Sequence, residues 1–356
     1  MSTPPLSCKY FRSLLRMEEK RTSSASTRKA DHIDLALSSQ VDAARTDKRF
    51  YYEPMFSAHP DPDTDLPLAF AGGKLRFPLW VSSMTGGTKL AGKINANLAR
   101  MCGEFGFGMG LGSCRMLLNS RERFADFDVR NFIGADLPLY ANLGIAQIEA
   151  GLRDNSTDAI ESLLRDLRVD GLIIHVNPLQ EWMQPEGDRI ARAPIDTIKE
   201  FIATFSTRVI VKEVGQGMGP ESIRALLQLP IQALEFAAHG GTNFTKLELL
   251  RASEVAGEAY AQMALVGHSA EEMVRFVNTA IQDSGGNIKC REIIISGGLS
   301  GFLDGHYLTN QLNLPSVYGH ASLFLRYAKE DYDTLRRFAK MQVEGLKLAQ
   351  AFLKVR

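Results

Sequence analysis

The sequence is poor in cysteine and has neither a long hydrophobic run nor a surplus of charge of one sign. Its four cysteines are scattered and show no CxxC spacing: Cys8, Cys102, Cys114 and Cys290. This distribution argues against a disulfide scaffold and a structural zinc site, and it favours a reducing cytoplasm. No apolar segment has the length of a signal peptide or a membrane-spanning helix. We therefore expect a soluble, cytoplasmic protein.

The charges balance, with 41 basic and 41 acidic residues among 356. A chain without net charge has no global field that would attract nucleic acid or an anionic membrane. Any anionic ligand must be held by local donors. Hydrophobic residues make up 45% of the chain, which is enough to bury a large core.

The N-terminal segment differs in composition from the rest of the chain. Residues 1–27 are polar and contain the serine-rich stretch TSSAST, which predicts a flexible arm. Met17 opens the segment MEEKR and is an alternative to Met1 as the start of translation. Residues 28–356 are expected to form a single domain.

Eight short runs of apolar and β-branched residues alternate with amphipathic helical patterns from Pro78 onward. The runs cover residues 78–84, 106–112, 137–144, 171–177, 208–214, 233–240, 292–298 and 316–322. Eight strand-helix units predict an α/β fold, a (β/α)8 TIM barrel, with a doubly wound open sheet as the alternative. In a barrel the C-terminal ends of the strands meet at one mouth, where the active site is built.

The residues at these strand ends are rich in glycine and hydrogen-bonding groups. The ends read MTGG, GSCR, ANLG, NPLQE, KEVGQG, HGGTN, SGGL and GHAS. A glycine after a strand is often ordinary turn geometry, but several on one rim let backbone N–H groups approach a ligand. The loops after the seventh and eighth strands, SGGLSG and GHAS, are candidates to hold a phosphate.

Lys212 lies in an otherwise apolar strand, close to the predicted mouth. Lysine is rarely buried without a partner. One alternative is an internal ion pair with Glu213 or Glu235, and the other is a cation beside an electron-rich ring or a phosphorylated cofactor. Neutral donors suited to the polar edge of a flavin stand at neighbouring strand ends: Asn142, Ser113 and Thr85. We therefore predict a flavin site.

The segment after the fourth strand, HVNPLQEWMQPEGDR, is unusually polar. It brings His175, Asn177, Gln180, Glu181, Glu186 and Asp188 to the predicted mouth. Pro178 is expected to keep the chain from entering a helix at once. A buried carboxylate needs a cation, so Glu181 is a candidate ligand of Mg²⁺ shared with a diphosphate. A solvated loop carboxylate is the alternative.

Basic residues that could hold such a diphosphate occur in two places. Arg28 and Lys29 form the cluster RKADHI at the end of the arm, and Arg115 follows the second strand. Adjacent basic residues usually serve solubility. Their position at the boundary between arm and barrel suggests a flap that folds over a diphosphate.

Taken together, these motifs resemble those of the flavin-dependent (type II) isopentenyl diphosphate isomerases. RKADHI, SMTGG, ANLG, HVNPLQE with PEGDR, VKEVGQG, GGTNF and SGG follow in that family's order over about residues 28–325. The resemblance implies an FMN-binding (β/α)8 barrel that interconverts isopentenyl and dimethylallyl diphosphate in isoprenoid biosynthesis. It also implies Mg²⁺, NADPH as the reductant of the flavin, and a homo-oligomer.

The resemblance further implies roles for individual residues. Arg28, Lys29 and Arg115 would hold the diphosphate and Glu181 the Mg²⁺. Gln180 would lie beside the isoprene unit and position it or relay a proton, and His175 would join the same hydrogen-bond network. FMN would be lined by Ser83, Met84, Thr85, Ser113, Asn142, Lys212, Thr242, Gly297, Gly298 and Ala321. The electron-rich reduced ring would stabilise a species with tertiary carbocation character, and its N5 would act as acid and base.

The sequence departs from that family at three positions. Cys114 stands where the family has glutamine, and Ser300 and Ser322 stand where it has arginines. The resemblance implies that the two missing arginines would contact the FMN phosphate. Backbone donors, or one of His239, His320 and Arg326, are candidates to replace them.

Two other functions remain open at this point. An FMN-dependent 2-hydroxy acid oxidase or dehydrogenase would share the barrel and the lysine after the fifth strand. However, HGGTN lacks the arginine that follows the histidine in such enzymes. A non-catalytic homologue that binds flavin or prenyl diphosphate is the other alternative, supported by the missing arginines.

Overall fold

The computed structural model describes residues 25–83 and 86–356, and the chain divides after Lys48 into two units. In the first unit, helix α2 (Ala25–Leu35) carries Arg28 and Lys29. A 3-10 turn, η1 (Ala43–Arg45), follows it. Met17 and most of the predicted arm lie outside the described residues. The predicted boundary after residue 27 and the choice of start site therefore stay predictions.

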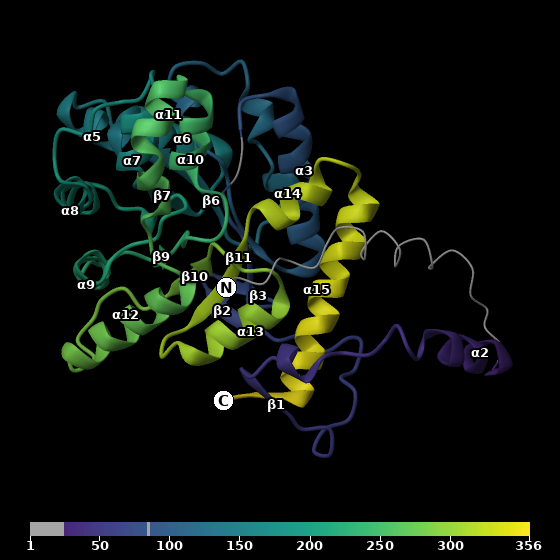
Figure 1. Ribbon diagram of the computed structural model, residues 1–356. Helices are drawn as coiled ribbons and strands as arrows, with labels where there is room; N and C mark the ends of the chain where they lie inside the picture. The colour runs from purple at the N-terminus through teal and green to yellow at the C-terminus, as the bar shows by residue number, and fades with distance from the viewer. Residues whose placement is uncertain (1–24, 84–85) are drawn as a thin grey trace. The chain divides into compact units, whose positions relative to one another are not determined.

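The second unit, Arg49–Arg356, is built on a closed barrel of eight parallel strands (Figure 1). In chain order the strands are β4 (Leu79–Val81), β5 (Gly108–Gly110), β6 (Leu139–Gly144), β7 (Gly171–His175), β8 (Arg208–Lys212), β9 (Ala233–Glu235), β10 (Ile293–Ser296) and β11 (Ser316–His320). Each strand pairs with the next, and β11 pairs with β4 to close the ring. Each lies within one predicted run. The predicted TIM barrel is confirmed, and the open sheet is excluded.

Helices connect the strands and cover the barrel. They are α3 (Lys89–Phe105), α4 (Arg130–Ile133), α5 (Ile145–Arg153), α6 (Asp158–Leu167), α7 (Pro178–Met183), α8 (Pro194–Thr204), α9 (Pro220–Leu227), α10 (Phe244–Arg251), α11 (Glu254–Tyr260), α12 (Ala270–Asp283), α13 (Phe302–Gln311), α14 (Ser322–Ala328) and α15 (Tyr332–Phe352), with the 3-10 turns η2 (Arg115–Leu118), η3 (Phe124–Asp126) and η4 (Ala261–Leu265).

Local signals set where these helices begin and end. Ser269 and Glu272 form a capping box at the start of α12, and Gly106 ends α3 in the left-handed conformation at φ 76°. Among the described helices none has both the length and the apolarity to cross a membrane.

Large apolar side chains fill the N-terminal end of the barrel interior. Seven strands each contribute one: Trp80, Tyr140, Ile173, Ile210, Ala233, Ile294 and Val317. The antiparallel hairpin of β2 (Leu68–Phe70) and β3 (Gly73–Leu75) adds Phe70 and Leu75 to this cluster. The Tyr140 hydroxyl donates to the Ala71 carbonyl at 2.9 Å. The hairpin therefore closes this end of the barrel. A second antiparallel pair, β1 (Phe50–Tyr52) with β12 (Leu353–Val355), joins the two ends of the unit.

Two positions further along, these seven strands carry polar residues or glycine, and β5 contributes Gly110. Side chains two residues apart face the same side of a strand, so these positions also face the interior. They form what we call the polar ring: Ser82, Gly110, Asn142, His175, Lys212, Glu235, Ser296 and Gly319. The strand register places His175 beside Lys212 and Lys212 beside Glu235. The barrel interior thus changes from apolar at its N-terminal end to polar at its mouth within two residues of each strand.

Candidate functional site

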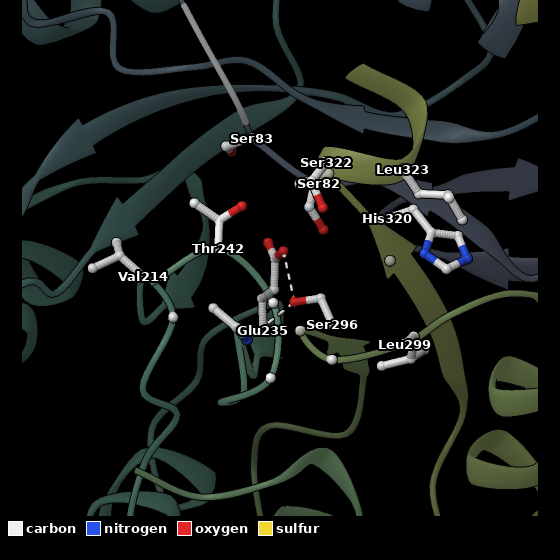
Figure 2. Close-up of a pocket in the computed structure, with 18 of the residues that line it drawn as sticks. Ser82, Ser83, Val214, Glu235, Thr242, Ser296, Leu299, His320, Ser322 and Leu323 are labelled. Carbon is white, nitrogen blue, oxygen red and sulfur yellow. Dashed lines mark hydrogen bonds between the residues drawn. The ribbon is translucent and has the colours of Figure 1, made fainter. Parts of the chain in front are cut away.

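A cavity of about 280 Å³ opens at the C-terminal ends of β8 to β11 and β4 (Figure 2). Six residues predicted to hold a cofactor line it: Ser83, Lys212, Thr242, Gly297, Gly298 and Ala321. Ser113 is exposed and Asn142 is buried in the polar ring, and neither lines the cavity. Met84 and Thr85 lie outside the described residues. The barrel mouth therefore brings most of the described cofactor candidates together.

Glycines allow the loops after β9 and β10 to pack backbone against backbone. Gly297 has φ +89°, and a Cβ there would lie 2.2 Å from the Ala238 carbonyl oxygen. A Cβ on Gly241 would lie 3.2 Å from the Gly298 nitrogen. Because side chains are absent at these positions, the two loops present main chain to the cavity. Such a wall suits a ligand that hydrogen-bonds to backbone N–H groups.

Glu235 is a site residue that the sequence reasoning considered only as an ion-pair partner. Its side chain is 0% exposed and lines the cavity. One carboxyl oxygen accepts a hydrogen bond from Ser296 Oγ at 3.1 Å, as Figure 2 shows, whereas the other has no partner. The sequence does contain a signal for this residue, because Glu235 is the one acidic residue in the otherwise apolar run ALEFAAHG.

Two hydroxyl groups that line the same cavity also lack hydrogen-bond partners, those of Ser82 and Ser83. Buried polar atoms without partners are costly, and they are rare in native proteins. Three such atoms around one cavity fit a ligand that carries several donors and acceptors. A flavin, with its polar ring edge and ribityl hydroxyls, has that chemistry.

Lys212 is buried, and its ammonium donates to the main-chain carbonyl of Glu213 at 2.8 Å. Neither Glu213 nor Glu235 forms an ion pair with it, so the predicted alternative of an internal ion pair is wrong. Glu213 instead accepts from the backbone N–H groups of three loop residues at 2.6–2.9 Å: Gly215, Gln216 and Gly217. Burial raises the pKa of Glu213 despite these bonds. Lys212 therefore remains available to a ligand in the cavity.

His175 and Asn142 form a hydrogen-bonded pair in the polar ring. His175 Nδ1 lies 2.6 Å from Asn142 Oδ1. Since an amide oxygen only accepts, Nδ1 carries the proton in this arrangement and Nε2 is an acceptor. Burial, together with the charge of Lys212, lowers the pKa of His175 to about 3. His175 is therefore neutral at physiological pH and is not a general acid there.

Gln180 and Glu181 lie on α7, which starts directly at Pro178. The expectation that Pro178 would delay a helix is wrong, because proline at the first helical position has no N–H to leave unpaired and a suitable φ. Asn177 Nδ2 donates to Gln180 Oε1 at 3.1 Å and to Glu181 Oε1 at 2.9 Å. The Asp188 amide donates to Glu181 Oε2 at 2.7 Å. Glu181 is buried, unlike a solvated loop carboxylate.

Arg115 is tied to the same segment. It forms an ion pair with Asp188 at 2.8 Å, and Gln147 Nε2 donates to the same carboxylate at 2.8 Å. The structure therefore brings Arg115, Gln180 and Glu181 into one hydrogen-bonded group. Cys114, by contrast, is buried in the apolar core, and its Sγ donates to the Gly112 carbonyl. The buried thiol therefore does not take the place of the amide that the family resemblance implies near the substrate.

The structure leaves open two predicted features of the site, namely the basic pair on α2 and the metal ion. Arg28 and Lys29 belong to the first unit of the chain, so their proposed role at the diphosphate stays a prediction. Within residues 25–83 and 86–356, no cluster of three or more His, Cys, Asp or Glu side chains could hold a metal ion. A metal at Glu181 would need further ligands from outside the protein.

Comparison with known proteins gives the family. No protein-family model matches the chain. The isopentenyl-diphosphate delta-isomerase of Rickettsia felis is 32% identical over 328 residues, which cover 90% of either chain. Proteins of the same name from Rickettsia akari and Rickettsia typhi are 31% and 32% identical, over 90% of this chain and 91% of theirs. The chain belongs to the isopentenyl-diphosphate delta-isomerase family.

Solved structures similar to this isopentenyl-diphosphate delta-isomerase family member include flavin enzymes. A mandelate oxidase with a monooxide FMN adduct has a TM-score of 0.55 at 15% identity, covering 87% of this chain and 89% of that one. A flavocytochrome b2 with sulfite bound has a TM-score of 0.57 at 13% identity, covering 85% and 72%. At this identity the likeness shows the shared barrel fold alone.

Proposed function

We propose that this protein interconverts isopentenyl and dimethylallyl diphosphate, with reduced FMN in the cavity and Mg²⁺ at Glu181. The observation that carries the proposal is the polar mouth of the barrel. There a cavity walled by glycine backbone and unpartnered polar atoms lies on the same rim as α7, with Gln180 and Glu181. The 32% identity to a curated isopentenyl-diphosphate delta-isomerase over 90% of the chain supports the substrate.

The residues of the cavity fit a flavin. Lys212 would hold the polar edge of the ring, Ser83 and Thr242 would supply hydroxyl donors, and Gly297, Gly298 and Ala321 would adjoin the phosphate. When bound, reduced FMN supplies an electron-rich ring face and an N5 that can give and take a proton. Neither Asn142 nor its hydrogen-bond partner His175 lines the cavity, so the pair would support the flavin site from the polar ring beside it.

The protein side chains position the alkene rather than protonate it. Moving the double bond adds a proton at one carbon and removes one from another, through a species with tertiary carbocation character. A neutral amide such as Gln180 and a neutral imidazole such as His175 are too weak as acids for that addition. They would orient the isoprene unit and relay protons, while the barrel mouth excludes water from the cation.

Glu181 would anchor Mg²⁺ with help from the substrate. Mg²⁺ prefers an octahedron of oxygen ligands and is often shared between one carboxylate, phosphate oxygens and water. Asn177 and the Asp188 amide hold the Glu181 carboxylate in place for this. Arg115, with Arg28 and Lys29, would balance the diphosphate charge. NADPH as the reductant, a homo-oligomer and a cytoplasmic location complete the proposal.

The test begins with the visible spectrum and continues with an isomerase assay. The purified protein should be yellow and, once its flavin is reduced, convert isopentenyl diphosphate when Mg²⁺ is present. Glu181→Gln should raise the Mg²⁺ concentration needed, whereas Glu258→Gln on exposed α11 should not. If Glu181→Gln kept the wild-type rate at limiting Mg²⁺, Glu181 would not be a ligand of the metal.

Gln180→Ala separates substrate positioning from flavin binding. It should lower turnover much more than flavin affinity. Equal losses of turnover and flavin affinity would show that Gln180 contacts the cofactor instead of the substrate. The same assay distinguishes the alternatives. A non-catalytic homologue would bind flavin without turnover, and a 2-hydroxy acid oxidase would reduce its flavin with a 2-hydroxy acid.

A further inference from the structure

The part of the cavity formed by the loops after β10 and β11 has no positively charged side chain in the described chain. These loops contribute Gly297, Gly298, Leu299 and Ser300 on one side and Ala321 and Ser322 on the other. We call this region the terminal end of the cavity. The charged residues that line the cavity are Lys212 and Glu235, which lie on β8 and β9 instead. A phosphate at the terminal end would thus meet neutral groups.

The donors of Ser300 are already engaged. Its amide nitrogen and its hydroxyl donate to one carboxylate oxygen of Asp304 at 2.6 Å and 2.5 Å. Asp304 also forms an ion pair with Arg49 at 2.7 Å. Although burial acts in the opposite direction, the bonds from Ser300 and Arg49 hold the pKa of Asp304 below its ordinary value. The Asp304 carboxylate, whose charge Arg49 balances, therefore takes up both donors of Ser300.

The residues that could have replaced the missing arginines do not supply a cation. The His320 ring packs edge-on against Tyr318 and Phe324, and burial lowers its pKa to about 4. It is neutral at physiological pH. His239 and Arg326 do not line the cavity. His239 Nε2 lies 3.2 Å from the Ala264 carbonyl, and the Arg326 guanidinium lies over the ring of Tyr327.

We propose that the cavity recognises the ring and ribityl chain of a flavin and gains little from its terminal phosphate, so that riboflavin binds nearly as well as FMN. This inference rests on the proposed function, because it takes a flavin as the ligand. A phosphate dianion loses its hydration on binding and needs charge-assisted bonds in return. Backbone N–H groups, Ser322 and the neutral His320 ring, whose Nε2 has no partner, would have to supply them without the help of a cation.

Flavin binding by the full-length protein tests the inference without any turnover. Protein depleted of flavin by dialysis is titrated with FMN and with riboflavin, and binding is followed by quenching of flavin fluorescence. We expect the two dissociation constants to agree within about tenfold. A change of ionic strength should affect both flavins alike, because no phosphate ion pair is screened.

Ser322→Arg restores a cation at the terminal end. It should tighten FMN binding by about tenfold and leave riboflavin unchanged, since a guanidinium pairs with phosphate and finds no partner on riboflavin. Ser322→Gln is the control of similar reach without charge, and it should favour neither flavin. Riboflavin affinity reports whether each variant keeps its fold.

The outcomes separate this inference from the proposed function. If wild-type protein binds FMN more than about a hundredfold tighter than riboflavin, the inference is overturned and the proposed function stands. The same holds if Ser322→Arg does not shift the preference toward FMN while still binding riboflavin. If neither flavin binds, the proposed function fails and the inference fails with it.

Discussion

Glu235 occupies an uncommon position for an acidic residue, because one of its carboxyl oxygens is buried without a partner on the cavity wall. Its other oxygen is held by Ser296, whose Oγ also accepts from the Ala237 amide. This arrangement fixes the carboxyl group before any ligand arrives. We expect the free oxygen to accept a hydrogen bond from a donor on the bound flavin.

Glu235→Gln tests that role by reversing the polarity of one atom. The amide oxygen would keep the bond from Ser296, so the NH₂ group would take the place of the free acceptor. Flavin affinity should fall about tenfold or more, as expected for the loss of a hydrogen bond worth roughly 1.5–3 kcal/mol. The stability of the flavin-free protein should stay the same or rise. Fluorescence titration and urea unfolding measure the two quantities, and an unchanged affinity would contradict the assignment.

His175 makes the stability of the protein depend on pH. The pKa of His175 is about 3 in the folded protein against an ordinary value of 6.5. Between these values the unfolded chain binds a proton that the folded chain does not, so stability is present above 6.5 and falls as the pH drops below it. In His175→Gln this contribution disappears. Urea unfolding at about pH 7.5 and about pH 5 should show a smaller difference in the variant. A difference equal to that of the wild type would rule out the depressed pKa.

At the level of elements, the loop after β10 requires a positive φ, which residues with a side chain rarely adopt. Gly297 has φ +89° and lies against the backbone of the loop after β9. The close approach of these two loops forms the glycine wall of the cavity. Two different requirements, a positive φ and a lack of space, coincide at this one position.

Gly297→Ala should lower both stability and flavin binding. A Cβ would lie 2.2 Å from the Ala238 oxygen and 2.3 Å from its nitrogen, so the two loops would have to separate. Gly285→Ala is the matched control, since Gly285 has φ +60° with nothing within 4 Å of its Cβ. The control should lose only about 1–2 kcal/mol from its left-handed backbone and keep its flavin. Thermal unfolding and flavin content per chain check both variants, and equal behaviour of the two would contradict the packing argument.

Over the whole barrel unit, the apolar cluster and the candidate site lie at opposite ends of the interior. The apolar cluster around Trp80 and the hairpin of β2 and β3 closes the N-terminal end, and the polar ring forms the mouth. Substitutions at the two ends should therefore have separate effects, as the architecture of TIM barrels leads one to expect.

Phe70→Ala probes the closed end. Phe70 is 1% exposed and meets Trp80 edge-on. Its truncation should cost about 3–5 kcal/mol of unfolding free energy through the cavity it leaves. Flavin affinity should be unchanged at temperatures where the variant is folded. Phe56, which is 77% exposed, is the control, and Phe56→Ala should change stability by less than about 0.5 kcal/mol. A loss of flavin affinity in folded Phe70→Ala would show that the two ends are coupled.

The number of barrel strands and their order along the chain could be predicted from local sequence patterns. Buried parallel strands are apolar on both faces, so each appears as a short continuous apolar run that ends in glycine or a polar residue. The same local pattern placed Lys212, Gln180, Glu181 and the glycine pair 297–298 at the mouth. The short helix after Pro178 was missed because proline both ends strands and begins helices.

Which of these polar groups have hydrogen-bond partners could not be predicted in that way, because it depends on how the chain folds. One oxygen of Glu235 is held by Ser296 on the neighbouring strand β10, and the Asp304 carboxylate that takes up the donors of Ser300 is paired with Arg49, 255 residues away. Local patterns do not encode such contacts, because strand register and loop approach arise when the barrel closes. Hydrogen bonding and charge at the mouth are therefore properties of the folded chain, whereas the positions of the strand ends are properties of its sequence.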